Sequence, residues 1–244
     1  MNRKPTSYNC SDDKTTLFRK GRDICRKMLC GVVLTALSGN ITLAIGAPRS
    51  EYWEQRVTLF NLLPVEDGDI VFLGNSITDG GEFHEIFDNP SVKNRGISSD
   101  VISGVRERLY QVTDHKPSKI FLLIGINDVS HNKSVNQLAE EYSDLVKEIR
   151  SNSPETELYI QSIMPINNDF KRYKNLIGKE ETVKQLNKRL QEIAQSNGAI
   201  YIDLWPFLSD SKGKLRKEFT NDGLHLLGKG YKAWTDAIRQ YIDN

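Results

Sequence analysis

The sequence predicts an α/β fold, a three-layer α/β/α sandwich in which helices cover both faces of a parallel sheet. From about residue 50 onward, short apolar runs typical of strands alternate with segments of helical periodicity. The run IFLLIG over 120–125 is apolar throughout, which is typical of a strand covered on both faces. Alternating strands and helices are joined by right-handed crossovers, which set neighbouring strands parallel. The chain of 244 residues is therefore expected to hold one α/β domain over 48–244, after a leader over 1–47.

Five short segments, most of them apolar, are expected to form the strands of this sheet. In chain order they are Asp69–Gly74, Ser91–Asn94, Ile120–Gly125, Glu157–Ile163 and Ala199–Leu204. The sequence between them contains no internal repeat and no low-complexity linker. The five strands are therefore expected to belong to one sheet within one domain.

The other segments of the body have the periodicity of amphipathic helices. The expected helices are Ser50–Leu63, Val101–Val112, a segment from Ser134 to about Asn152, Glu180–Ser196 and Leu226–Ile242. Ser134 is expected to cap the third helix, and Ser99 or Asp100 the second, because their side-chain oxygens accept free N–H groups of the first turn. Apolar residues recur along one face of the third helix, at Leu138, Tyr142, Leu145 and Ile149.

The first 47 residues are typical of an export leader. Residues 1–27 carry eight Lys and Arg against three Asp, and residues 28–47 carry no charge. A basic segment before an apolar run is typical of a secretory signal, and cleavage is expected after Ala44 or Gly46. The alternative is an uncleaved membrane anchor, because these 20 uncharged residues just cross a bilayer of roughly 30 Å. In either case the body is expected to be exported, to the periplasm or the extracellular space.

The composition argues against several classes of protein and site. A net charge of +1 argues against a nucleic-acid-binding protein, which would carry a basic excess. All three cysteines lie in the leader, so the body is expected to lack disulfides and cysteine-based metal sites. The sequence has no glycine-rich phosphate loop, and an isolated Asp-x-x-His pair provides too few ligands for a metal hydrolase. No metal and no cofactor are therefore expected.

Polar residues gather in loops that follow the expected strands, where open parallel sheets bind their ligands. Ser76 follows the first strand in a turn that exposes its hydroxyl as a nucleophile. Asp222 and His225 lie three residues apart, a spacing at which the carboxylate can orient the imidazole as a general base. The N–H groups of Ser76 and Gly96 and the Asn127 amide are candidate donors to an oxyanion. Together these groups are typical of acyl transfer to a serine.

Four segments, in order along the chain, resemble the sequence blocks of the SGNH, or GDSL-type, hydrolase family. They are VFLGNSITDGG at 71–81, NRGIS at 94–98, IGIND at 124–128 and NDGLH at 221–225. The chain is most similar to bacterial relatives of platelet-activating-factor acetylhydrolase catalytic subunits, over roughly residues 69–240. The resemblance implies a flavodoxin-like sheet of five parallel strands, hydrolysis of esters, and no metal. Asn75 departs from the family motif, which has Asp there, but this removes no catalytic group.

The resemblance implies a serine esterase with Ser76, Asp222 and His225 as its triad and with Ser76, Gly96 and Asn127 in its oxyanion hole. Short acyl esters are expected, acetyl above all, and O-acetyl groups on carbohydrates would suit an exported enzyme. Three alternatives stay open: a lipid esterase of lysophospholipase or acetylhydrolase type, an O-acyltransferase with the same triad, and a non-catalytic glycan-binding module. The expected partner is a small-molecule or glycan ester. Contact with a membrane is expected only through the leader, and the oligomeric state stays open.

Further residues near these loops are candidates for contact with the substrate. They are Thr78, Asp79, His84, His131 and Trp205. Thr78 and Asp79 could equally cap the turn after Ser76, and packing is the favoured role of Trp205, with substrate contact as the alternative. The cluster Lys171, Arg172 and Lys174 is expected to be solvated surface, with contact to an anionic substrate as the alternative.

Overall fold

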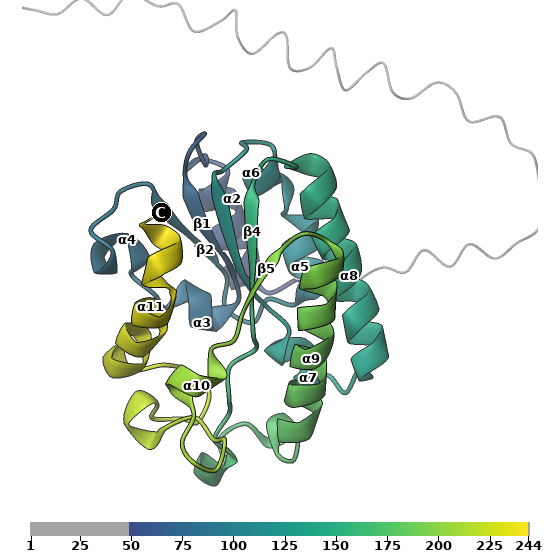
Figure 1. Cartoon of the computed structure of the whole chain (residues 1–244), viewed down its shortest axis with the longest axis vertical. Helices are drawn as coiled ribbons and strands as arrows, with labels where there is room; N and C mark the ends of the chain where they lie inside the picture. Colours follow the sequence, from purple (N-terminus) through teal and green to yellow (C-terminus); the bar gives the residue numbers. More distant parts are fainter. Residues whose placement is uncertain (1–48, 244) are drawn as a thin grey trace, which may run out of the picture. The chain divides into compact units, whose positions relative to one another are not determined.

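A parallel sheet of five strands runs through the centre of the computed structural model, which describes residues 49–243 (Figure 1). The strands are β1 Ile70–Gly74, β2 Val92–Gly96, β3 Lys119–Leu123, β4 Glu157–Gln161 and β5 Ile200–Ile202. Their order, β2-β1-β3-β4-β5, is that of flavodoxin-like doubly wound sheets. Every strand pairs parallel with its neighbours. The predicted fold class is therefore confirmed.

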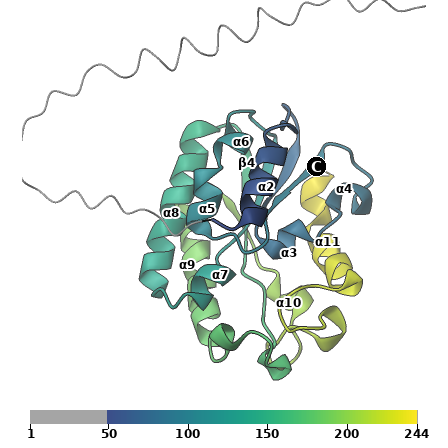
Figure 2. The same ribbon diagram turned by 180° about the vertical axis from the view of Figure 1, so that it is seen from behind.

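Helices cover both faces of this sheet, which gives the three layers (Figures 1 and 2). One face is covered by α5 (Ile102–Glu107), α8 (Val135–Asn152) and α9 (Glu180–Ser196). The opposite face is covered by α4 (Phe83–Ile86) and α11 (Gly228–Ile242). The remaining helices are α2 (Glu51–Phe60), α3 (Ser76–Asp79), α6 (Tyr110–Thr113), α7 (Ile126–Ser130) and α10 (Trp205–Leu208).

The long helices lie where the periodicity predicts them. Helix α9 has the expected bounds, and α11 begins two residues later than expected. Helix α8 begins directly after Ser134, whose hydroxyl accepts the Gln137 N–H while the Gln137 side chain accepts the Ser134 N–H. This reciprocal capping box confirms the predicted start of the helix.

The predicted helix over 101–112 is instead broken into α5 and α6. Arg108 leaves the helical conformation between them, with φ −106° and ψ 13°. Its side chain is fully buried and reaches Asp100 and the carbonyl of Gly74. The break therefore accompanies a buried ion pair that no local pattern of the sequence reveals.

The first turn of α5 is not capped by Ser99 or Asp100, contrary to the prediction. A residue that is distant in the sequence caps it. The Ile102 N–H instead donates to the carboxylate of Asp128, with 3.2 Å between N and Oδ2. Asp128 is fully buried, and the nearest cation, Lys133, lies 3.9 Å from its Oδ1. Burial raises the pKa of Asp128 to about 6.

This raised pKa makes the stability of the fold depend on pH. The folded state holds the Asp128 proton up to about pH 6, whereas the unfolded chain releases it near the ordinary pKa of Asp. The stabilisation from this group is therefore complete below about pH 4 and is lost as the pH rises through 6. Relative to Asp128→Asn, the wild-type free energy of unfolding should fall by about 2–3 kcal/mol between pH 4 and pH 7.5. Urea denaturation of both proteins across this range measures the difference, and a difference independent of pH would contradict the prediction.

A row of aromatic rings crosses the sheet beneath α4 and α11. Phe72, Phe121 and Tyr159 occupy paired positions on β1, β3 and β4, with ring centroids 5.0 and 4.5 Å apart. Phe83 of α4 stacks on Phe72 at 4.0 Å, and Trp234 of α11 meets Phe83 edge-on. All five side chains are buried. The cluster fixes β1 against α11, and these elements carry the two ends of the site described next.

The predicted leader over 1–47 lies outside the described residues, so its role in export stays a prediction. Among the helices of residues 49–243, none is both long enough and apolar enough to cross a membrane.

Candidate active site

A pocket of about 640 Å³ lies where the predicted catalytic loops meet. Its wall contains Ser76, which follows β1, Ser99, which follows β2, and Asn127, which follows β3. His225, which lies just before α11, completes this group. The structure thus brings together loops that are far apart in sequence, at the carboxyl ends of the strands.

The nucleophile candidate sits in a tight turn between β1 and α3. Asn75 caps α3, because its Oδ1 accepts the Ile77 N–H at 3.1 Å. A carboxylate oxygen could accept the same bond, so the departure from the family motif leaves the turn intact. Gly74 is required by close packing, since a Cβ there would lie 2.3 Å from Thr78 Oγ1. The turn places Ser76 at the first position of the helix, on the pocket wall.

A chain of hydrogen bonds joins the three predicted catalytic residues. The Ser76 hydroxyl lies 2.9 Å from His225 Nε2, and His225 Nδ1 lies 2.7 Å from Asp222 Oδ2. A proton on Nδ1 donates to the carboxylate, which leaves Nε2 free to accept the serine hydroxyl. This is the geometry that a serine nucleophile with a His–Asp base requires.

Asp222 is held ionised by its surroundings. Its Oδ1 accepts the backbone N–H groups of Leu224 and His225, each at 2.8 Å. Its Oδ2 accepts the Tyr173 hydroxyl at 2.8 Å and the imidazole. Burial raises the pKa of Asp222, but the hydrogen bonds from His225, the backbone and Tyr173 outweigh it and hold the pKa well below its usual range. The carboxylate is therefore charged at neutral pH.

Tyr173 is a residue of this site that the sequence did not reveal. Its hydroxyl lies 2.8 Å from Asp222 Oδ2 and 3.0 Å from His225 Nδ1, and its ring meets the imidazole edge-on at 5.7 Å. Burial, followed by the bond to Asp222, raises the pKa of Tyr173 to about 12, so the hydroxyl remains a donor. In the sequence, the KRYK segment around Tyr173 is notable only for its charges. No local pattern connects Tyr173 with Asp222 and His225, which lie about fifty positions later.

Replacing Tyr173 by Phe should lower kcat. The hydroxyl donates to Asp222 and lies 3.0 Å from His225 Nδ1, so its loss leaves the triad carboxylate with one donor fewer. We expect a several-fold fall in kcat for a neutral ester, with KM nearly unchanged. Steady-state kinetics measure both constants, and a kcat equal to that of the wild type would show that the hydroxyl has no part in positioning the triad.

Gly96, the predicted oxyanion donor of the second loop, has a different role in the structure. Its N–H donates to the side chain of Asn94, with 2.7 Å between N and Oδ1. Its backbone packs against α3 so closely that a Cβ would lie 2.1 Å from the Asp79 nitrogen. Gly96 is also not part of the pocket wall. The glycine therefore allows β2 and α3 to meet, and its N–H is already bonded.

Ser99 offers the pocket a free backbone N–H group, which was expected of Gly96. It adopts a left-handed conformation, with φ 66°, and lies on the pocket wall with Ser76. Among residues 49–243, no acceptor is bonded to its N–H. Asn127 lies on the same wall and is oriented by a bond from its Nδ2 to the Asp100 carbonyl at 2.8 Å. The second amide hydrogen of Asn127 stays available to a ligand.

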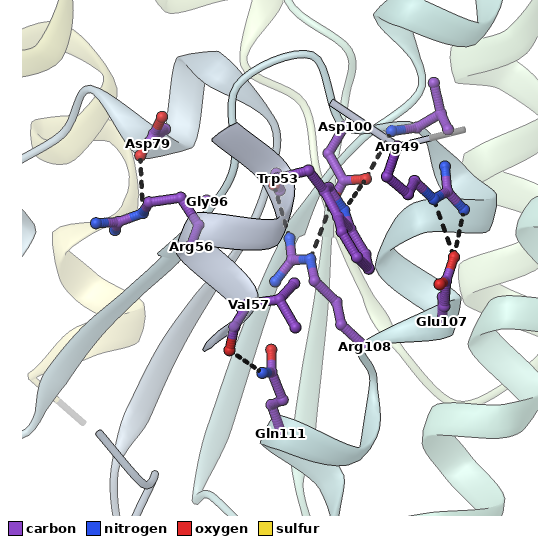
Figure 3. A network of polar contacts seen from close by, with 12 residues as sticks. Arg49, Trp53, Arg56, Val57, Asp79, Gly96, Asp100, Glu107, Arg108 and Gln111 are labelled. Carbon is purple, nitrogen blue, oxygen red and sulfur yellow. Dashed lines mark hydrogen bonds and ion pairs between the residues drawn. The ribbon is translucent and has the colours of Figure 1, made fainter. Parts of the chain in front are cut away.

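A buried ion pair supports these loops from behind (Figure 3). Asp100 accepts the Trp53 Nε1–H at 3.2 Å and the Arg108 Nε–H at 2.8 Å. Arg108 also donates to the carbonyl of Gly74, at 3.1 Å. Because Asp100 further holds Asn127 through its carbonyl, this network joins the loops that follow β1, β2 and β3.

The five other candidates for substrate contact all lie outside the pocket wall. Thr78 is buried, and Asp79 accepts hydrogen bonds from Tyr52 and Ser98. The side chains of His84 and His131 are exposed, and Trp205 donates to a backbone carbonyl beside a separate surface pocket. Burial or existing bonds thus give Thr78, Asp79 and Trp205 structural roles. Within residues 49–243, no group of three His, Cys, Asp or Glu side chains is placed to hold a metal ion.

The fold and the site together define the class of protein. A doubly wound parallel sheet with a Ser–His–Asp arrangement at the carboxyl ends of its strands is typical of serine hydrolases with an α/β fold. Residues 72–233 match the model of the GDSL-like lipase/acylhydrolase family. The chain belongs to this family, and the protein is an enzyme, an esterase of the GDSL type.

Solved structures with the same fold extend the comparison. A protein of Streptococcus pneumoniae, provisionally named a platelet activating factor, is 29% identical, with a TM-score of 0.71 over 78% of this chain and 92% of its own. A GDSL-like lipase of Bacteroides thetaiotaomicron is 21% identical, with a TM-score of 0.67 over 78% and 97%. A variant of an acetyl-xylooligosaccharide esterase of Geobacillus is 19% identical, with a TM-score of 0.57 over 74% and 96%. No curated protein matches the chain.

Proposed function

We propose that the protein is a serine esterase that removes short acyl groups, acetyl above all, from polar alcohols such as sugar hydroxyls. The observation that carries this proposal is the chemistry of the pocket wall. Its apolar side chains are Leu176 and Leu224, whereas hydroxyl, amide and charged groups form most of the remainder. A long acyl chain would need a continuous row of apolar side chains, whereas this wall contains only these two aliphatic side chains.

The geometry supports the following sequence of steps. Ser76 Oγ attacks the ester carbonyl while His225 Nε2 accepts its proton, and Asp222 keeps the imidazole in place. The N–H groups of Ser76 and Ser99 and the amide of Asn127 stabilise the oxyanion. His225 then gives the proton to the leaving alcohol, and a water molecule repeats the cycle on the acyl-enzyme. In this proposal Ser99 takes the place that the sequence suggested for Gly96.

Acetylated carbohydrates are the substrates to test first. The related fold of an acetyl-xylooligosaccharide esterase supports this choice. A basic segment followed by an uncharged one, within residues 1–47, supports an exported enzyme that would meet such glycans outside the cytoplasm. The near-neutral net charge gives no support to a nucleic-acid partner.

The test compares 4-nitrophenyl acetate, butyrate and octanoate with the full chain and with Ser76→Ala. We expect the acetate to have at least a tenfold higher kcat/KM than the octanoate, and Ser76→Ala to lose more than about 10³-fold of the activity. Octanoate as the best substrate would favour a lipid esterase instead. Equal inertness of both proteins in water, with turnover only when a sugar acceptor is added, would favour an O-acyltransferase. Inertness in both assays would leave a binding role.

A further inference from the structure

Two cations, Arg172 and Lys174, stand on the wall of the active-site pocket. Both are exposed, as the sequence favoured, and the segment that joins β4 to α9 also brings them to the pocket. This segment is tied to the triad, because the Tyr173 hydroxyl donates to Asp222. It is also tied within itself, because Asn168 Nδ2 donates to a backbone carbonyl eight residues later at 2.9 Å. Arg172 and Lys174 therefore lie on either side of Tyr173 in the sequence, and Tyr173 contacts the triad carboxylate.

These two cations lack the partners that neighbouring cations have. Lys214, on an adjacent loop, pairs with Asp169 at 2.6 Å, whereas Arg172 and Lys174 make no ion pair among the described residues. The pocket wall contains no Asp or Glu side chain. The nearby carboxylate of Asp222 is occupied by its own hydrogen bonds. The mouth of the pocket is thus positively charged, and such a cleft attracts an anion.

The chemistry of an acetyl ester does not by itself call for these charges. The acyl group is neutral, and its carbonyl oxygen is served by the oxyanion donors, so the cations would face the alcohol part of the substrate. A guanidinium presents a planar pair of donors that fits a carboxylate or a phosphate, and an ammonium adds a point charge.

We propose that the natural ester carries a negatively charged group, a carboxylate or a phosphate, beside its acylated hydroxyl, and that Arg172 and Lys174 bind this group. The inference rests on the proposed esterase function and names the substrate class of the same site.

The test uses pairs of acetylated sugars in which one member carries a charged group and the other does not. The first pair is a mono-O-acetylated methyl glucuronoside and its methyl ester, and the second is mono-O-acetylated glucose 6-phosphate and the corresponding acetylated glucose. Acetate release from each gives kcat/KM for the full chain. We expect the wild type to prefer the charged member of at least one pair by about tenfold, and the preferred pair tells a carboxylate from a phosphate.

Variants connect this preference with the two side chains. Arg172→Gln and Lys174→Gln should each reduce the preference about threefold, and the double variant should abolish it. Lys171→Gln is the matched control, because Lys171 is an exposed cation of the same segment that is not on the pocket wall. It should keep the full preference.

The outcomes separate this inference from the function on which it rests. Absence of Ser76-dependent turnover of 4-nitrophenyl acetate would remove the esterase function itself. Normal turnover of that ester, with no preference in either sugar pair, would overturn only the anionic substrate. A preference that survives the double variant, or that Lys171→Gln also removes, would overturn the role of these two side chains.

Discussion

Asp222→Asn should lower kcat for 4-nitrophenyl acetate by about 10⁴-fold and leave KM nearly unchanged. The amide oxygen can keep the backbone bonds that Oδ1 now accepts from Leu224 and His225, so the loop should retain its shape. The amide NH₂, however, would face the imidazole where Oδ2 now accepts the Nδ1 proton. The imidazole would then carry its proton on Nε2 and could not accept the proton of Ser76.

The control for this experiment is Asp169→Asn, which removes an exposed carboxylate that pairs with Lys214. Its activity should equal that of the wild type, and both variants should show the wild-type circular dichroism. A folded Asp222→Asn enzyme with a kcat within tenfold of the wild type would show that Asp222 is not the partner of the catalytic base.

Arg108→Met should lower the free energy of unfolding by about 3–5 kcal/mol, because it leaves the Asp100 carboxylate buried without its cation. Burial already raises the pKa of Asp100, and Arg108 is the first of the groups that oppose this effect. The specific activity of the folded fraction should fall too, since the same network holds Asn127 and the carbonyl of Gly74. Urea denaturation and a parallel ester assay measure the two effects.

Arg106→Met is the matched control, since Arg106 lies two residues earlier, in α5, and makes an exposed ion pair with Glu148. Its loss should cost less than about 1 kcal/mol. If Arg108→Met does not fold, the double variant Asp100→Asn/Arg108→Met should regain part of the stability, because it buries no unpaired charge. A cost for Arg108→Met that equals that of Arg106→Met would contradict the supporting role of the pair.

The candidate catalytic residues could be predicted from the sequence because each lies in a short sequence block. Ser76, Asp222 and His225 lie in blocks whose local turns already present their side chains, and the structure brings them together. The parallel sheet was also predictable, because continuous apolar runs such as IFLLIG are typical of strands that are covered on both faces.

The features that were missed depend on contacts between distant parts of the chain. Tyr173 joins the site through a bond to Asp222, and Asp128 caps a helix that begins 26 residues earlier. For Gly96 the obstacle was different, since a side chain two residues away, Asn94, takes up the N–H that the loop was expected to expose. Such bonds depend on side-chain directions that neither periodicity nor spacing records.

The bond between Ser76 and His225 joins positions 149 residues apart, which has a consequence for the life of a newly made chain. A ribosome completes the sheet strand by strand, and the nucleophile emerges long before its base does. In the proposed mechanism, a nascent chain that has reached only β5 cannot yet act on an ester, because it has every strand of the sheet but lacks His225. Activity then appears only when the segment that carries His225 docks, and a truncation product that ends before residue 221 would be inert however well it folds.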